Sequence, residues 1–272
     1  MEIQEFEALI LSELKKVVED IIKTTPTLPV KVASGERQGD YISKHLEKAF
    51  VEKAGNHNHF INSKTSLLGK TKSPYDIEST FTYKNHNELI WVDFKAINID
   101  NKDSNADSGT YTKVITFIQE GHFYLTYIYV YYQDAGNGNM KFSKNNEGEM
   151  VKVYFLKDIG DNMHITPLNQ MQVNFQAGTV YRTREEFIDF FITKLKKSYE
   201  YRSLDSRDMM AKLDGDEIRL GKYKKPKELK AIKESSKIST KSKVIKPIKR
   251  ESITFNEFKQ LNKEQEEKIK NL

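Results

Sequence analysis

The chain has 272 residues, of which 38% are hydrophobic and 11% aromatic, so it can bury a sizeable core in one large domain or two small ones. It contains no Cys, which excludes disulfides, thiolate zinc sites and cysteine nucleophiles. No apolar run approaches the ~18 residues of a membrane span, and the acidic start lacks the basic region of a secretory signal. We therefore expect a cytoplasmic protein.

The net charge of +5 is concentrated towards one end of the chain. Residues 222–250 carry 12 Lys or Arg and 2 Glu, whereas residues 1–221 are mildly acidic. Such a basic segment is typical either of a tether to a polyanion such as DNA or of a solvated linker. We predict a folded domain over 1–221, a Lys-rich linker or DNA-tethering tail over 222–250, and an amphipathic helix over 251–272.

Apolar periodicity and turn residues predict an α/β (α+β) fold with a central mixed β-sheet flanked by helices. Residues 55–73 and 100–110 are polar and are expected to be loops, the second of them mobile, and turns are expected at 84–87 and 136–139. The run at 123–132 is apolar on both faces, as in a central strand. The predicted elements are helices at 2–23, 39–54, 110–119, 184–200 and 253–270, and strands at 77–83, 89–99, 123–132, 151–156 and 171–177.

One strand carries residues with chemical potential. Asp93 and Lys95 are two positions apart in the strand at 89–99, so their side chains point to the same face. If this strand pairs with 77–83 as a hairpin, Asp76 reaches the same end of the sheet. Two carboxylates and one ammonium then lie together beside a hydrophobic layer.

Such a set suits the hydrolysis of a phosphodiester. Mg²⁺ prefers carboxylate oxygens and keeps several waters, so two aspartates can hold one ion that polarises a phosphoryl oxygen and activates a water. A neighbouring Lys can orient that water and offset negative charge as it develops. The same residues are also compatible with a cross-strand ion pair on a solvated sheet face.

The arrangement Pro74-Tyr75-Asp76 followed by Asp93-Phe94-Lys95 resembles the P-D…(D/E)-x-K nuclease core of type II restriction endonucleases. The order of elements over about 33–200 is most similar to that of the EcoRV and HincII group, whose core is a mixed sheet flanked by helices. The resemblance implies that Asp76 and Asp93 are the two metal-binding acids and that Lys95 is the motif lysine. The chain departs from the motif at Tyr75, which separates the proline from the first aspartate.

Further metal ligands are expected among nearby acids. Glu78 would share a face with Asp76 in a strand, which makes it the alternative ligand if Asp76 does not serve. In such folds, the helix before the motif commonly supplies an accessory acid, and the candidates here are Glu36, Asp40 and Glu47. We rank Glu36 and Asp40 first because they lie at the helix entrance, where acids also favour the helix dipole.

The resemblance implies a Mg²⁺-dependent, site-specific hydrolysis of double-stranded DNA that leaves 5′-phosphate and 3′-hydroxyl ends. It implies a homodimer, because a two-fold protein matches a palindromic site. It also implies a prokaryotic cytoplasm and a functional partner, a DNA methyltransferase of the same specificity.

DNA-reading residues are expected on the strand near 171–177, where alternate positions carry amides. Amide side chains pair with adenine edges in the major groove, although an exposed face of neutral polar residues would look the same. Basic residues elsewhere are candidate phosphate contacts. The amide candidates are Gln170, Gln172, Asn174 and Gln176, and the basic candidates are Lys102, Lys113, Arg182 and Arg184.

The residues leave two other functions open. One is a DNA repair or junction-resolving nuclease with the same core, which would prefer branched DNA. The other is a DNA-binding protein without catalysis, which would bind without metal and cleave nothing.

Overall fold

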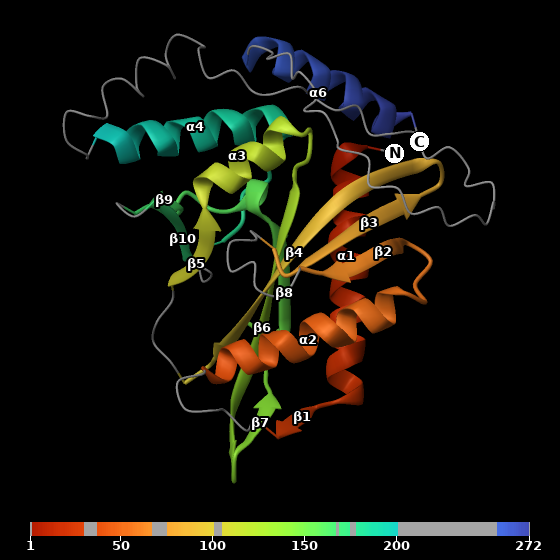
Figure 1. Ribbon diagram of the computed structural model, residues 1–272, viewed down its shortest axis with the longest axis vertical. Coiled ribbons are helices and arrows are strands. Elements are labelled where there is room, and N and C mark those ends of the chain that lie inside the picture. Colours follow the sequence, from red (N-terminus) through yellow and green to blue (C-terminus); the bar gives the residue numbers. More distant parts are fainter. Residues whose placement is uncertain are drawn as a thin grey trace, which may run out of the picture.

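The computed structural model describes a central mixed sheet with helices on both faces (Figure 1). This confirms the fold class expected from the sequence. No helix in the described part of the chain is long and apolar enough to cross a membrane. The described residues are 2–29, 37–66, 75–100, 105–166, 169–174, 178–200 and 255–271.

The central sheet has seven strands in the described residues, in the order β1-β7-β6-β4-β3-β2, with β8 also paired to β6. β4 and β6 run parallel, and the other pairs are antiparallel. β6 is buried on both faces, as its continuous apolar sequence predicted. The strands are β1 (Thr27–Pro29), β2 (Phe60–Thr65), β3 (Ile77–Tyr83), β4 (His86–Asn98), β6 (Tyr124–Gly136), β7 (Asn139–Phe142) and β8 (Val151–Phe155).

The predicted helices are confirmed, with ends within two residues of those expected. They divide between the two faces of the sheet: α1 and α2 cover one face, and α3 and α4 cover the other. The helices are α1 (Ile3–Thr24), α2 (Gln38–Ala54), α3 (Tyr111–Gln119), α4 (Arg184–Glu200) and α6 (Phe255–Lys270), with a 3-10 turn η1 (Leu156–Asp158).

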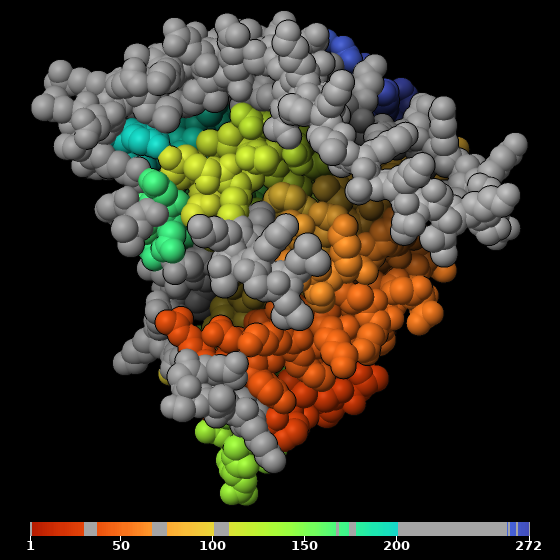
Figure 2. Space-filling view, viewed as in Figure 1, coloured from red at the N-terminus to blue at the C-terminus, as the bar shows by residue number. Residues whose placement is uncertain are grey.

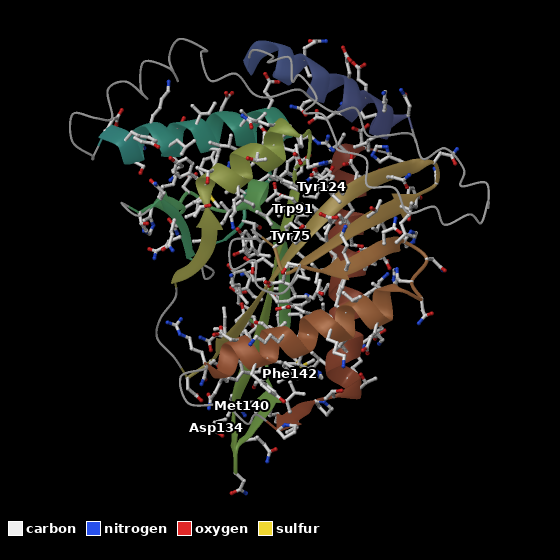
Figure 3. The ribbon with its side chains drawn as sticks, in the orientation of Figure 1. Tyr75, Trp91, Tyr124, Asp134, Met140 and Phe142 are labelled. Carbon is white, nitrogen blue, oxygen red and sulfur yellow. The ribbon has the colours of Figure 1, made fainter. Side chains whose placement is uncertain are left out.

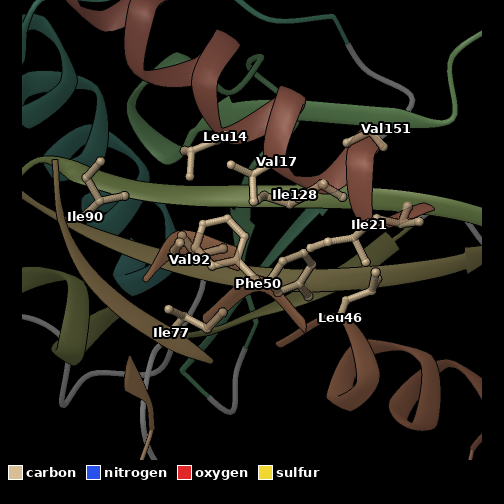
Figure 4. Packing of buried hydrophobic residues seen from close by; sticks show 14 of the residues in the cluster. Leu14, Val17, Ile21, Leu46, Phe50, Ile77, Ile90, Val92, Ile128 and Val151 are labelled. Carbon is tan, nitrogen blue, oxygen red and sulfur yellow. The ribbon is translucent and has the colours of Figure 1, made fainter. Parts of the chain in front are cut away.

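Two apolar layers result from this arrangement. In the layer under α1 and α2, Leu14, Phe50, Val92 and Ile128 pack together (Figure 4). α6 contacts α1 and α4, and its Ile269 is fully buried in this same layer, so the predicted terminal helix packs on the domain. Burial of such side chains is the main stabilisation of the fold.

Two predicted loops contain strands. Within 55–73 the structure forms β2, and within 100–110 it forms β5 (Asn105–Thr110). β2 lies at one end of the sheet order and β5 at one end of a three-stranded sheet, β5-β10-β9, with β10 (Gln170–Asn174) and β9 (His164–Ile165). Strands at sheet edges need little hydrophobic alternation, which is why the sequence pattern missed them.

The turn expected at 136–139 is confirmed as the tip of the β6–β7 hairpin. Gly136 pairs with Asn139, and Asn137 and Gly138 both have positive φ values, 53° and 74°. This is the geometry that an Asn-Gly pair favours in a two-residue hairpin turn. The hairpin projects at the lower tip of the molecule (Figure 2).

Candidate active site

Asp76 lies directly before β3 and is held by three hydrogen bonds. Its backbone N–H donates to the Val92 carbonyl at 2.8 Å, and its carbonyl accepts from the Ser66 N–H at 2.7 Å. Its carboxylate Oδ2 accepts from the Phe94 backbone N–H at 2.7 Å. Because Ile77 pairs with Val92 in the β3–β4 ladder, Asp76 lies one step further, opposite Asp93. The predicted hairpin therefore does bring Asp76 to the Asp93 end of the sheet.

Asp93 and Lys95 lie on the same face of β4, as strand alternation predicted. The Lys95 Nζ is 2.9 Å from the Asp93 Oδ1, and their side chains are 25% and 11% exposed. In the parallel ladder with β6, Asp93 pairs with Tyr127 and Lys95 with Tyr129, both fully buried. The ion pair is thus flanked by two buried tyrosines of the neighbouring strand and is only partly exposed to solvent.

The electrostatics of this site are unbalanced. Burial raises the pKa of Asp76 to about 8, with further increases from the charges of Asp93 and Glu47, against the opposing effects of the Phe94 N–H and Lys95. Burial and the charge of Asp93 also raise the pKa of Glu47 above its ordinary value, although Lys44 opposes them. Three acids thus lie in the fields of two lysines, Lys95 and Lys44.

Glu47 is the accessory acid that the structure brings close to this pair, although the sequence ranking placed it last. It lies half-buried on α2, beside the stripe of Leu46 and Phe50 that faces the sheet. Asp40 is exposed in the first turn of α2, and Glu36 lies outside the described residues. The position next to the buried stripe was the available signal, and the preference for the helix entrance missed it.

The acids fit a hard divalent cation that keeps most of its waters. Among the described residues, no three Asp, Glu or His side chains converge closely enough to enclose a metal by themselves. Mg²⁺ does not require such a cage, because it binds through one or two carboxylates plus water and substrate phosphate. Burial, together with the charges of Asp93 and Glu47, raises the pKa of Asp76, and a bound cation would favour the ionised carboxylate by displacing its proton.

Glu78, the predicted alternative ligand, is engaged with other partners. Its Oε1 is 2.8 Å from the Lys64 Nζ, and its Oε2 accepts hydrogen bonds from the Trp91 Nε1 at 3.3 Å and the Tyr75 hydroxyl at 3.2 Å. Burial alone would raise the pKa of Glu78, but these partners hold it below the ordinary value. Glu78 is therefore an ionised acceptor within a structural network beside the site.

The predicted amide strand is present as β10. Met171 and Val173 are buried in the layer under α3 and α4, and Gln170 and Gln172 are half-buried at the alternate positions. The alternation expected of this strand is thus confirmed. The side chain of Asn174 and all of Gln176 lie outside the described residues.

Two of the basic residues expected to contact phosphates are instead buried. The Arg184 side chain is 0% exposed, and its Nη2 lies 3.0 Å from Glu88 Oε1 and 2.8 Å from the Tyr124 hydroxyl. Arg182 is also buried, where it donates to the Lys157 carbonyl and pairs with Asp161 at 3.0 Å. The prediction of phosphate contacts was wrong for both residues, because positive charge in the sequence does not reveal burial. Lys113 is half-buried on α3, and Lys102 lies outside the described residues.

A mixed sheet with two aspartates and a lysine at the end of a β-hairpin is the arrangement expected of the type II restriction endonuclease class, whose members are site-specific deoxyribonucleases. A family model bears this out, since it matches residues 2–213 and is described as SwaI-like, SwaI restriction endonuclease. The match spans most of the chain, and the chain belongs to this family.

Similarity to other known proteins is weak. Among solved structures, the NlaIV restriction endonuclease is similar, with 12% sequence identity, a TM-score of 0.43, and coverage of 79% of this chain and 86% of that one. That likeness is too weak to bear on the site. No curated protein sequence matches. The finer likeness to EcoRV and HincII is not confirmed by these findings and stays a prediction.

Proposed function

We propose that this restriction endonuclease hydrolyses double-stranded DNA in a Mg²⁺-dependent reaction at Asp76, Asp93 and Lys95. The observation that carries the proposal is the position of Asp76, fixed by the Phe94 N–H opposite the Asp93–Lys95 pair. Its raised pKa supports a cation site, since perturbed carboxyls in a shared cluster mark functional positions.

Each residue of the site has a distinct role in the proposed reaction. When bound, Mg²⁺ would supply Lewis-acid polarisation of a phosphoryl oxygen and a more acidic water. Asp76 and Asp93 would hold the ion, and Glu47 would add negative charge from α2. Lys95, whose Nζ is held 2.9 Å from Asp93 Oδ1, would orient the attacking water and offset the negative charge that develops on the phosphate. The water oxygen would bond to phosphorus as the bond from phosphorus to the 3′ oxygen breaks; the water gives up a proton to solvent and the 3′ oxygen takes one up, which leaves 5′-phosphate and 3′-hydroxyl ends.

Other parts of the chain would bind and read the DNA. Gln170 and Gln172 project from β10 opposite its core-facing residues, so they are the described amides available to base edges. Asn174, Gln176, Lys102 and Lys113 remain candidates for the same interface. The basic segment 222–250 would add a sequence-independent, salt-sensitive attraction to the nuclease domain at 1–221.

We also propose that the enzyme acts as a homodimer paired with a DNA methyltransferase of matching specificity. Two active sites related by a two-fold axis would cut both strands of a symmetric sequence. Light scattering or sedimentation of the purified chain, with and without a short duplex, tests the dimer. A monomer in both conditions would overturn it.

The test of the proposed function is a cleavage assay on bacteriophage DNA with Mg²⁺ or EDTA. We expect discrete bands with Mg²⁺ alone, and sequencing of their ends gives the site and the end chemistry. Asp93→Asn should remove cleavage, while Asp20→Asn, which changes a more exposed aspartate, should not. A smear would favour a repair-type nuclease, and binding without cleavage would overturn the catalytic proposal.

A further inference from the structure

Tyr75 is the one residue that departs from the motif, and the structure places it in an aromatic stack. Its ring centroid is 4.4 Å from that of Trp91, and Trp91 in turn stacks on Phe117 at 3.9 Å, with 23° between the planes. Tyr75 and Trp91 lie next to each other near the centre of the molecule (Figure 3). The residue inserted before Asp76 is therefore packed against β4, two positions from Asp93.

The same two aromatic residues share one oxygen of Glu78. Tyr75 donates its hydroxyl hydrogen to Glu78 Oε2, and Trp91 donates its Nε1–H to the same atom. The other oxygen of Glu78 pairs with Lys64 on β2. Glu78 therefore links three neighbouring strands to the segment that enters β3, and the partially buried charge is fully occupied by these contacts.

This network acts on the backbone from which Asp76 projects. Asp76 lies opposite Asp93, and the direction of its side chain depends on how the backbone is held on either side of it. On the side of β4, the Val92 carbonyl and the Phe94 N–H hold Asp76. On the preceding side, the anchor is Tyr75, through its ring and its hydroxyl.

We propose that Tyr75 is a positioning residue, which through its stack on Trp91 and its hydrogen bond to Glu78 holds Asp76 opposite Asp93 so that both carboxylates face one cation. The proposal rests on the proposed function, because it assigns Tyr75 a role in that same site. Residues that orient metal ligands typically contribute about 10–100-fold to metal affinity or activity.

The chain contains a direct reporter of this network. Trp91 is its only tryptophan, so intrinsic fluorescence excited at the tryptophan band comes from the stacked ring itself. Mn²⁺ shares the oxygen-ligand preference of Mg²⁺ and, being paramagnetic, quenches nearby fluorescence. Quenching of Trp91 by Mn²⁺ thus measures cation binding at Asp76 and Asp93 without DNA and without turnover.

The experiment compares Tyr75→Phe, Tyr75→Ala and Tyr83→Phe in the full chain. Tyr83→Phe is the matched control, because it removes a tyrosine hydroxyl from the far end of β3, the strand that Tyr75 precedes. We expect the Mn²⁺ quenching midpoint to rise about 10–100-fold in Tyr75→Ala and by a smaller factor in Tyr75→Phe, with the control unchanged. Cleavage should need correspondingly more Mg²⁺, while DNA binding in EDTA stays the same.

Two results would overturn the proposal, and they can be told apart. If the Trp91 emission of Tyr75→Ala shifts but its Mn²⁺ midpoint equals that of the control, Tyr75 packs without positioning the site. If wild-type protein shows no saturable quenching, and Asp76→Asn behaves identically, the cation site itself fails together with the proposed function. Tyr75→Phe keeps the ring, so it decides the question even if Tyr75→Ala does not fold.

Discussion

β4 carries two clusters of buried charge, and they differ in the balance between acidic and basic side chains. Near its start, Glu88 belongs to a group of three buried acids and three buried bases, one of which, Arg182, also pairs with the exposed Asp161. Further along, Asp93 belongs to a group in which Asp76 and Glu47 add two more carboxylates against the ammonium of Lys95. The first cluster is balanced and the second is not. The acids of the balanced cluster are Glu7, Glu88 and Asp158, and its bases are Lys157, Arg182 and Arg184.

The balanced cluster joins elements that are distant in sequence. Lys157, fully buried on η1, lies 2.7 Å from Glu7 on α1 and donates to the Arg182 carbonyl at 2.7 Å. Arg184, at the start of α4, reaches Glu88 on β4 at 3.0 Å. Although burial tends to raise the pKa of Glu88, Arg184 and His86 hold it below its ordinary value. Each acid of this group has a basic side chain within ion-pair distance, which lowers the cost of burying it.

The unbalanced cluster is different. Asp76 is buried with a pKa raised to about 8, although it accepts a hydrogen bond from the Phe94 N–H. A chain selected for stability alone would not gather acids in this way, whereas a cation-binding site needs them. Balance within a cluster thus separates the structural charges of β4 from those that we propose for catalysis.

The largest effect that this comparison predicts is on cleavage. Lys95→Ala removes the ammonium that pairs with Asp93 in the unbalanced cluster, so we expect the cleavage rate to fall by about 10²–10⁴-fold. Gel assays under single-turnover conditions measure it. Lys23→Ala, which breaks an exposed ion pair on α1, is the matched control and should cleave normally. If Lys95→Ala cleaves normally, Asp93 and Lys95 form an ion pair without a role in catalysis.

The largest effect on stability is expected at the balanced cluster. Arg184→Met leaves Glu88 buried without its guanidinium, and breaking a buried pair in this way costs about 3–5 kcal/mol. Urea unfolding measures the change. Adding Glu88→Leu removes the carboxylate left without a partner, so the double variant should recover part of the lost free energy of unfolding. If the single variant unfolds like the wild type, the pair is not the stabilising contact that its burial suggests.

The contrast also explains what could be read from the sequence. Asp93 and Lys95 were predictable because strand alternation places them on one face, and Asp76 because the hairpin places it at the same end. Glu88 and Arg184 were not, since they are 96 positions apart and nothing local pairs them. The same limit produced the wrong assignment of Arg182 and Arg184 to phosphates. Charge in a sequence gives no sign of burial, which depends on how distant elements pack.

The helices and central strands were predictable from periodicity, whereas the short edge strands were not. β2 and β5 carry few apolar residues because an edge strand packs little of its surface. Glu47 was missed for a related reason. Its approach to Asp93 depends on which face of α2 meets the sheet, and the choice among three helix acids requires that orientation.

A pH-dependent effect is expected at Glu7 in the balanced cluster. Burial raises its pKa from 4.5 to about 7 despite the opposing charge of Lys157. Glu7 lines an open cavity of about 430 Å³ beside α1 and β8, so solvent protons can reach it. A carboxyl with a raised folded-state pKa stabilises the fold below its unfolded pKa, and this contribution is lost as the pH rises from about 4.5 to 7.

Glu7→Gln tests that dependence. The neutral amide cannot ionise, so the variant avoids the loss, and the difference in unfolding free energy should move in its favour as the pH rises through this window. Above pH 7 the difference should be constant. Thermal or urea unfolding at several pH values in EDTA measures it, and a difference independent of pH would contradict the raised pKa.

The smallest effect is expected from a change at the start of α4 that removes the helix cap and leaves the buried Arg184 in place. Thr183 caps this helix: its hydroxyl oxygen accepts from the Glu186 N–H at 3.2 Å, and Glu186 accepts from the Thr183 N–H at 2.7 Å. These two reciprocal bonds form a capping box. Thr183→Ala should cost about 1 kcal/mol, as for other caps, because Arg184 next to it keeps Glu88 and Tyr124. Urea unfolding measures this as well, and a loss as large as that of Arg184→Met would mean that the cap, rather than the buried ion pair, fixes α4 to the sheet.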